Sequence, residues 1–159
     1  MDRRLDAEAD AFEKLRAMQA NAEELSAGLT TRAAQLRGAL PAAEATLARL
    51  ADRYTEGALT PIAGNATEAA ARLDFADEQL REAATALAGK DRGRAALAIR
   101  GAEQAVGQAS NLLAALDKGA ADLDAAGANV TRLLDEVQAE VAAGKAARQA
   151  AGDAGEPTR

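Results

Sequence analysis

The fold is decided by residues 99–141, which read IRGAEQAVGQASNLLAALDKGAADLDAAGANVTRLLDEVQAEV. Apolar or small residues recur in this stretch at alternating spacings of three and four, from Ile99 through Leu116 to Val141. This spacing places them on one face of an α-helix. A disordered chain has no reason to keep such a register over the whole stretch, so the pattern predicts one long helix.

Two further stripes with the same spacing precede it. One runs from Ala69 to Leu87 and is regular throughout. The other runs from Leu5 to Tyr54 and is weaker before Leu29, where three of its positions are polar. Alanine, the strongest helix former, supplies 47 of the 159 residues, and β-branched residues are scarce. We therefore expect an all-α protein: an elongated, alanine-rich helical bundle or coiled coil with one very long C-terminal helix.

Composition excludes several classes of function. The chain has no histidine and no cysteine, which rules out histidine-based triads, thiol catalysis and zinc sites of the usual kind. A formal charge of −6 argues against nucleic-acid binding, which needs an excess of lysine and arginine. No apolar run approaches the ~20 residues that span a bilayer. We expect no enzyme activity, no cofactor, no metal site and no nucleic-acid partner.

Glycine, proline and helix-capping residues predict the helix boundaries. Proline costs about 3 kcal/mol inside a helix, so Gly38 and Pro41 predict a break or a kink, and Asn21 marks a second possible break. The elbow after Tyr54 contains Thr60 before Pro61, a typical helix start. The expected helices cover residues 2–37, 41–56, 66–88 and 92–148 within a single domain, residues 1–150, followed by a frayed tail, residues 151–159.

Capping residues refine the short connections. Asn65 with Glu68 predicts a capping box at the start of the third helix. Gly89 is expected as the left-handed residue that ends this helix, and Asp91 as the N-cap of the next one. These two helices should therefore form a hairpin with a very short turn.

The last helix is too long for its hairpin partner to cover. Its stripe beyond Leu116 needs another surface, and residues 5–36 could supply it if the chain reverses near Gly38–Pro41 or Asn21. We favour this closure within one chain, because the order glycine then proline suits a reversal. If the chain does not reverse there, both ends expose apolar stripes that should pair between chains.

Basic residues cluster near the predicted hairpin turn, as Lys90, Arg92, Arg94 and Arg100. Such a cluster could contact anionic lipid headgroups or an acidic partner, and its other interpretation is solubility at an exposed turn. Asp74, Asp77 and Glu78 share one helix face, which fits either part of a metal site or a solvated surface balanced by Arg81.

The aromatic inventory is Phe12, Tyr54 and Phe75. Three aromatic side chains spread along the chain provide no stacking platform for bases. We expect Tyr54 and Phe75 to pack in the core near helix junctions.

Several stretches resemble actinobacterial TPM-domain membrane proteins: residues 4–12 (RLDAEADAF), 40–47 (LPAAEATL), 54–65 (YTEGALTPIAGN), 72–76 (RLDFA) and 101–109 (GAEQAVGQA). In that family a secretion signal and an extracytoplasmic TPM domain precede a transmembrane helix, and a long helical region follows. The chain resembles this last region alone. The resemblance implies a parent protein tethered to the membrane, with this region on the cytoplasmic face and soluble as a fragment, and it supplies no catalytic residue.

These observations favour a non-enzymatic helical interaction or spacer region of a membrane-anchored protein, which contacts protein partners or itself through apolar seams. The alternative is a membrane-surface coiled-coil scaffold that contacts anionic lipid through the basic hairpin turn. A carboxylate-based metal enzyme ranks third, because Glu8 is the one carboxylate on the three stripes.

Overall fold

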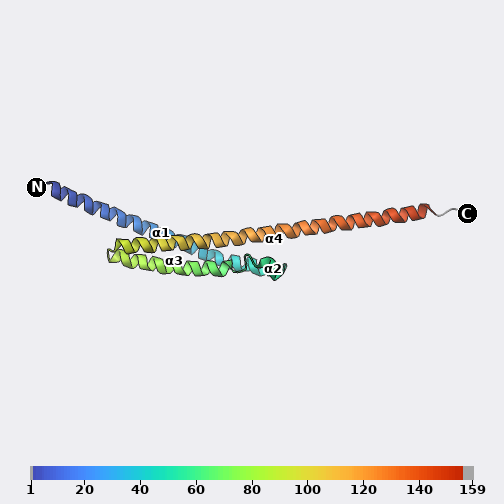
Figure 1. Ribbon diagram of the computed structural model, residues 1–159, viewed down its shortest axis with the longest axis horizontal. Helices are drawn as coiled ribbons and strands as arrows, with labels where there is room; N and C mark the ends of the chain where they lie inside the picture. The colour runs from blue at the N-terminus through green and yellow to red at the C-terminus, as the bar shows by residue number, and fades with distance from the viewer. Residues whose placement is uncertain (1, 156–159) are drawn as a thin grey trace. The chain divides into compact units, whose positions relative to one another are not determined.

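The computed structural model describes residues 2–155 and contains four helices: α1 (Asp2–Ala51), α2 (Glu56–Leu59), α3 (Asn65–Ala88) and α4 (Arg92–Ala154) (Figure 1). No strand occurs within this part of the chain, so the prediction of an all-α fold with a very long C-terminal helix is confirmed. The chain divides into two compact units, of which the first ends at Gly119 and the second begins at Ala120. This division falls within the single domain expected for residues 1–150.

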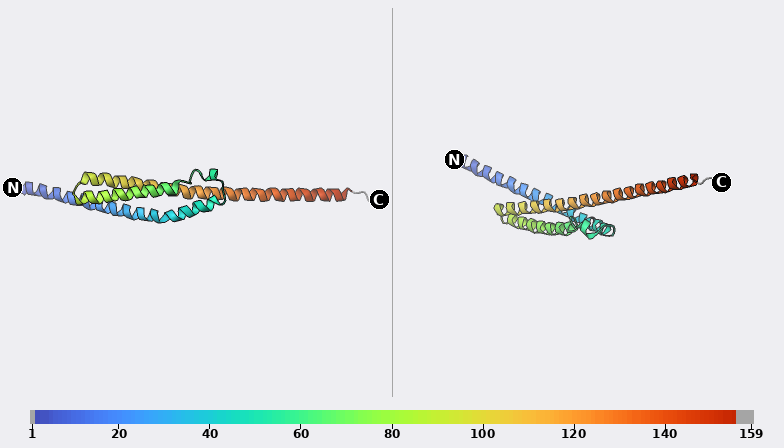
Figure 2. Two further views of the ribbon diagram at one scale, coloured as in Figure 1. Left: turned by 90° about the horizontal axis from the view of Figure 1, so that it is seen from below. Right: turned by 45° about the vertical axis from the view of Figure 1, so that its right-hand side comes forward.

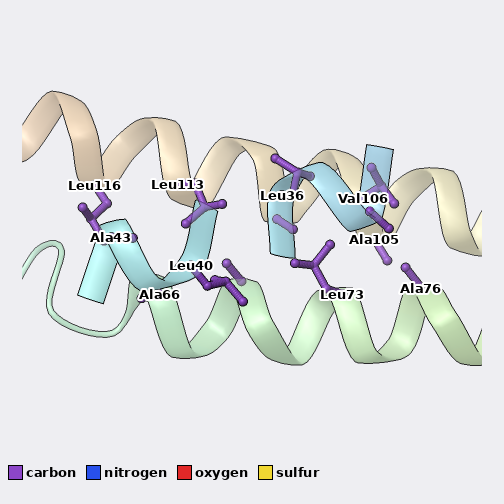
Figure 3. Close-up of a cluster of buried hydrophobic side chains, with 13 residues drawn as sticks. Leu36, Leu40, Ala43, Ala66, Leu73, Ala76, Ala105, Val106, Leu113 and Leu116 are labelled. Carbon is purple, nitrogen blue, oxygen red and sulfur yellow. The ribbon is translucent and has the colours of Figure 1, made fainter. Parts of the chain in front are cut away.

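The core of the first unit lies where α1, α3 and the start of α4 pack side by side (Figure 3). The largest fully buried side chains are Leu50 from α1, Leu73 from α3 and Leu116 from α4. The main cluster of buried residues includes Leu73 and Leu116 and consists of seven alanines, five leucines and one valine. It comprises Ala33, Leu36, Leu40, Ala43, Ala66, Ala69, Leu73, Ala76, Ala105, Val106, Ala109, Leu113 and Leu116.

The predicted stripes match the buried positions in this unit. Every stripe residue from Ala69 to Leu87 is buried, as is every one from Ile99 to Leu116. In α1 the stripe is buried or half-buried from Leu29 to Leu50. The helical period read from the sequence therefore identifies the faces that pack together.

Of the break or kink expected at Gly38–Pro41, the break is wrong, because α1 continues through both residues and through Asn21. Pro41 lies on the exposed side of α1, whereas Leu40 and Ala43 beside it are buried. Packing of these neighbours against the other two helices outweighs the backbone hydrogen bond that proline removes. Figure 2 shows α1 bending along this stretch instead of reversing.

The elbow differs from its predicted caps. Thr60 closes α2, because its N–H donates to the carbonyl oxygen of Glu56 (3.1 Å). Gly64 is the N-cap of α3, without a side-chain cap. The Asn65 amide instead donates through Nδ2 to the carbonyl oxygen of Leu112 on α4 (3.1 Å). A residue expected to cap its own helix thus joins two helices.

The predicted ends of the other helices also shift. The expected helix at 41–56 is the end of α1, and α1 stops at Ala51. α4 extends beyond the expected residue 148 to Ala154, so the first part of the expected frayed tail is helical, and residues 156–159 lie outside the described chain.

Two glycines of α4 lie close to side chains from other parts of this unit. A Cβ atom built on Gly119 would lie 2.6 Å from Cγ2 of Ile62, a buried residue of the elbow. A Cβ atom on Gly101 would lie 2.9 Å from Oε1 of Gln79 on α3. By contrast, a Cβ atom on Gly107 would meet nothing within 4 Å.

Because Gly119 is crowded and Gly107 is not, substitution of glycine by alanine should have opposite effects on stability at these two positions of α4. Gly119→Ala should lower the free energy of unfolding by about 1–3 kcal/mol, because the stiff β-branched Ile62 must move. Gly107→Ala should raise it by up to ~1 kcal/mol through helix propensity alone. Urea unfolding of both variants followed by circular dichroism checks this pair, and equal effects would contradict the close approach at Gly119.

Candidate interaction surfaces

The turn between α3 and α4 ends α3 with a Schellman motif. The N–H of Asp91 donates to the carbonyl oxygen of Ala86 (2.8 Å), and the N–H of Lys90 donates to that of Leu87 (3.1 Å). Lys90, with φ 58°, occupies the left-handed position, whereas Gly89 has φ −83°. The expectation that Gly89 is the left-handed residue is therefore wrong by one position. Glycine, which adopts positive φ without strain, stands one position before the left-handed residue, so Lys90 adopts the strained backbone conformation instead.

Acidic residues contact one of the basic residues at this turn, Arg94. Asp91 begins α4 as predicted: its Oδ1 accepts from the N–H of Arg94 (3.2 Å). The Arg94 guanidinium also forms an ion pair with Glu82 of α3 through Nε and Oε1. The positive charge of Arg94 is thus largely balanced by α3.

The four basic residues that were predicted to contact lipid or an acidic partner do not all lie at the turn between α3 and α4. Lys90 and Arg92 lie at the turn, with Lys90 exposed and Arg92 half-buried. Arg100 lies further along α4, where it lines a groove of about 370 Å³ together with Met18 and Leu25 of α1. A second groove of about 420 Å³ separates α1 from α3 and includes Ser26 and Leu87.

The acidic face of α3 binds α1. Arg37 of α1 forms ion pairs with Asp74 (3.0 Å) and Asp77 (2.6 Å). Burial withdraws water from the Arg37 guanidinium and opposes its charge, but hydrogen bonds and charges from both carboxylates outweigh this and raise the pKa of Arg37. Arg81, the balancing residue expected from the sequence, lies on the same helix as these carboxylates, whereas Arg37, which pairs with them, lies on a different helix and could not be identified from spacing along one helix. Within residues 2–155 no cluster of three or more acidic side chains has the geometry to hold a metal ion.

Two sets of exposed apolar side chains remain on the surface. The N-terminal stripe of α1 comprises Leu5, Phe12, Leu15, Met18 and Leu25, which are 36–66% exposed. The C-terminal stripe of α4 comprises Val130, Leu133, Leu134, Val137 and Val141, which are 46–57% exposed. The expected core position of Phe75 is also wrong, since it is 46% exposed, whereas Tyr54 is half-buried.

The fold and its surfaces define the class of this molecule as an all-α helical bundle with exposed apolar stripes. No helix in the described part of the chain is long and apolar enough to cross a membrane. No protein-family model matches the chain, and no solved structure matches it.

Two UPF0603 proteins of Mycobacterium tuberculosis, from strains H37Rv and CDC 1551 / Oshkosh, are similar to it. Each is 38% identical over 82 residues, which is 52% of this chain and 12% of the relative. The match thus spans about an eighth of the length of each relative.

Replacing Lys90 tests the strained turn. Lys90→Gly should raise the free energy of unfolding by about 1 kcal/mol, because glycine adopts positive φ without a Cβ penalty. Lys90→Ala, which removes the same charge and keeps the Cβ atom, serves as the control and should bring no such gain. Thermal unfolding followed by circular dichroism measures both, and a gain shared by the two variants would assign the effect to charge.

Replacing Arg37 tests the cross-helix ion pairs. Arg37→Gln should lower the free energy of unfolding by about 0.5–1 kcal/mol, a modest loss because all three side chains are partly exposed. The loss should shrink in ~1 M salt, where the Debye length falls to about 3 Å. Arg81→Gln on α3 makes the same change in net charge and should have a smaller effect. Urea titrations at two salt concentrations distinguish them.

Proposed function

We propose that the chain is a non-enzymatic helical interaction or spacer region that binds protein through its N-terminal and C-terminal stripes. The observation that carries this proposal is the C-terminal stripe, whose five leucine and valine residues each expose about half of their surface. Contiguous apolar surfaces of this kind on soluble proteins mark interaction sites. The charged residues on the opposite face of the same helix, such as Arg132 and Glu136, pair with each other instead (2.5 Å).

The proposed parent is a longer, membrane-anchored protein with this region on the cytoplasmic face. The resemblance of residues 4–12, 40–47 and 54–65 to TPM-domain membrane proteins of actinobacteria supports it. The mycobacterial similarity, which covers a small share of each relative, is consistent with a helical region inside a longer chain. The phosphatase or metal-binding roles attributed to TPM domains are not part of this proposal, because the chain resembles the helical region alone.

The basic residues at the α3–α4 turn support a lipid-binding scaffold less well. Arg94 is paired with Glu82, and Asp91 lies beside it, so the turn presents less net charge than its sequence suggests. Anionic membranes attract segments whose lysines and arginines are free to reach the surface. Protein contact through the stripes is therefore the preferred function.

Site-specific photo-crosslinking tests the proposal. A photoreactive phenylalanine derivative at Phe12 or at Leu134 should give protein adducts in cells that produce the chain. The same group at the outward positions Ala17 and Ala139 is the matched control and should give few or none. Equal yields at stripe and control positions, or no adducts at all, would overturn the proposal. Flotation with phosphatidylglycerol vesicles should leave the protein unbound, and binding abolished by Lys90→Ala with Arg92→Ala would favour the lipid scaffold.

A further inference from the structure

The C-terminal stripe lies on a helix segment that is poorly stabilised by its own sequence. Between residues 127 and 144 it carries two glycines, Gly127 and Gly144, and several β-branched residues. Glycine costs ~1 kcal/mol relative to alanine in a helix interior, and valine and threonine cost several tenths. The Arg132–Glu136 pair returns about 0.3–0.5 kcal/mol. Most helices gain their stability from packing of an apolar face, so this one requires a partner surface.

The stripe has the spacing of a coiled-coil seam. With Leu134 and Val141 at a positions and Val130 and Val137 at d positions, every a and d residue from Gly127 to Gly144 is apolar or glycine. Leu133, at a g position, widens the apolar surface on one side. The seam keeps the alternating spacing of three and four residues that the buried α4 positions from Ile99 to Leu116 also have.

The charges beside the seam complement a second copy of the same seam. Between residues 126 and 147 the e and g positions hold two charged side chains, Glu140 at g and Lys145 at e. A parallel pair of helices brings a g residue of one helix to the e residue five positions later on the other. Glu140 therefore meets Lys145 of the second copy, twice in the pair, and no like charges face each other. An antiparallel pair joins g to g and e to e, which would separate Glu140 from Lys145.

Charge also disfavours a membrane as the occupant. From Asn129 to Val141 the helix carries three acidic residues, Asp135, Glu136 and Glu140, against the single basic residue Arg132. A helix that lies on an anionic membrane is instead rich in lysine and arginine on its polar face. We infer that the C-terminal stripe binds a second copy of this chain as a parallel coiled coil, with Glu140 joined to Lys145 across it. This inference rests on the proposed function and names its partner.

Self-association of the full 159-residue chain is the first measurement. Sedimentation equilibrium over a concentration series should give a dimer that dissociates on dilution. Hydrogen exchange at amides 127–144 should slow as the dimer forms, because pairing supplies the missing helix stability. Leu134→Lys with Val137→Lys should give a monomer while the first unit keeps its unfolding midpoint, which separates loss of pairing from loss of folding. A wild-type chain that stays monomeric throughout the series would overturn the inference.

Charge swapping tests the predicted pairs. Glu140→Lys and Lys145→Glu should each weaken dimerisation roughly tenfold, since each replaces two attractive pairs by two repulsive ones. The double swap should restore the wild-type dissociation constant. Glu136→Lys changes the net charge as Glu140→Lys does but lies on the outer face, so it should leave dimerisation within about twofold. Equal weakening by Glu140→Lys and Glu136→Lys, or no recovery in the double swap, would refute the pairing.

Cysteine cross-linking determines whether the two paired helices are parallel or antiparallel. The sequence has no cysteine, so introduced cysteines can cross-link only with each other. Val130→Cys alone and Val141→Cys alone should each form disulfide-linked dimers, because a parallel pair brings identical positions together. Ala139→Cys on the outer face should not. Cross-linking confined to a mixture of the two seam variants would indicate an antiparallel pair and overturn the inference. If the chain is monomeric but Leu134 photo-crosslinks to a different protein in cells, the inference fails while the proposed function stands.

Discussion

The small size of the alanine side chain is the constraint on which the packing of the first unit depends. Seven of the thirteen residues in the main cluster are alanines, so the backbones of α1, α3 and α4 must lie close together for their methyl groups to touch. Leu50, Leu73 and Leu116 provide one large buried side chain from each helix. At Gly119 a methyl group would collide with Ile62 of the elbow, whereas at Gly101 it would displace the end of the flexible Gln79 side chain.

Polar contacts then fix which helices lie beside each other. Arg32 of α1 donates to Oγ of Ser110 on α4 (3.2 Å), and Arg37 reaches α3. Asn65 joins α3 to the backbone of α4. Alanine seams alone specify partners weakly, since one methyl stripe resembles another. These directional contacts, which join every pair among α1, α3 and α4, supply the specificity that the core lacks.

Periodicity predicted the helices and the buried faces, because those depend on residues three and four apart in one sequence. It failed where tertiary packing competes with local preference. Pro41 looks like a break, and packing of Leu40 and Ala43 holds the helix through it. Asn65 looks like a cap and binds a distant carbonyl oxygen, and Arg37 finds its carboxylates 37 and 40 residues away. The basic turn residues were visible in the sequence, whereas the Glu82 that neutralises Arg94 depends on the hairpin geometry.

The alanine-rich core also shapes how the molecule responds to temperature. Each buried methyl removes little apolar surface from water, and exposure of apolar surface is what raises the heat capacity on unfolding. The heat-capacity increment per residue should therefore fall below the ~12–15 cal/mol/K of ordinary globular domains. A small increment flattens the stability curve, so the free energy of unfolding of the first unit should change slowly with temperature, on the cold side as well as the hot side.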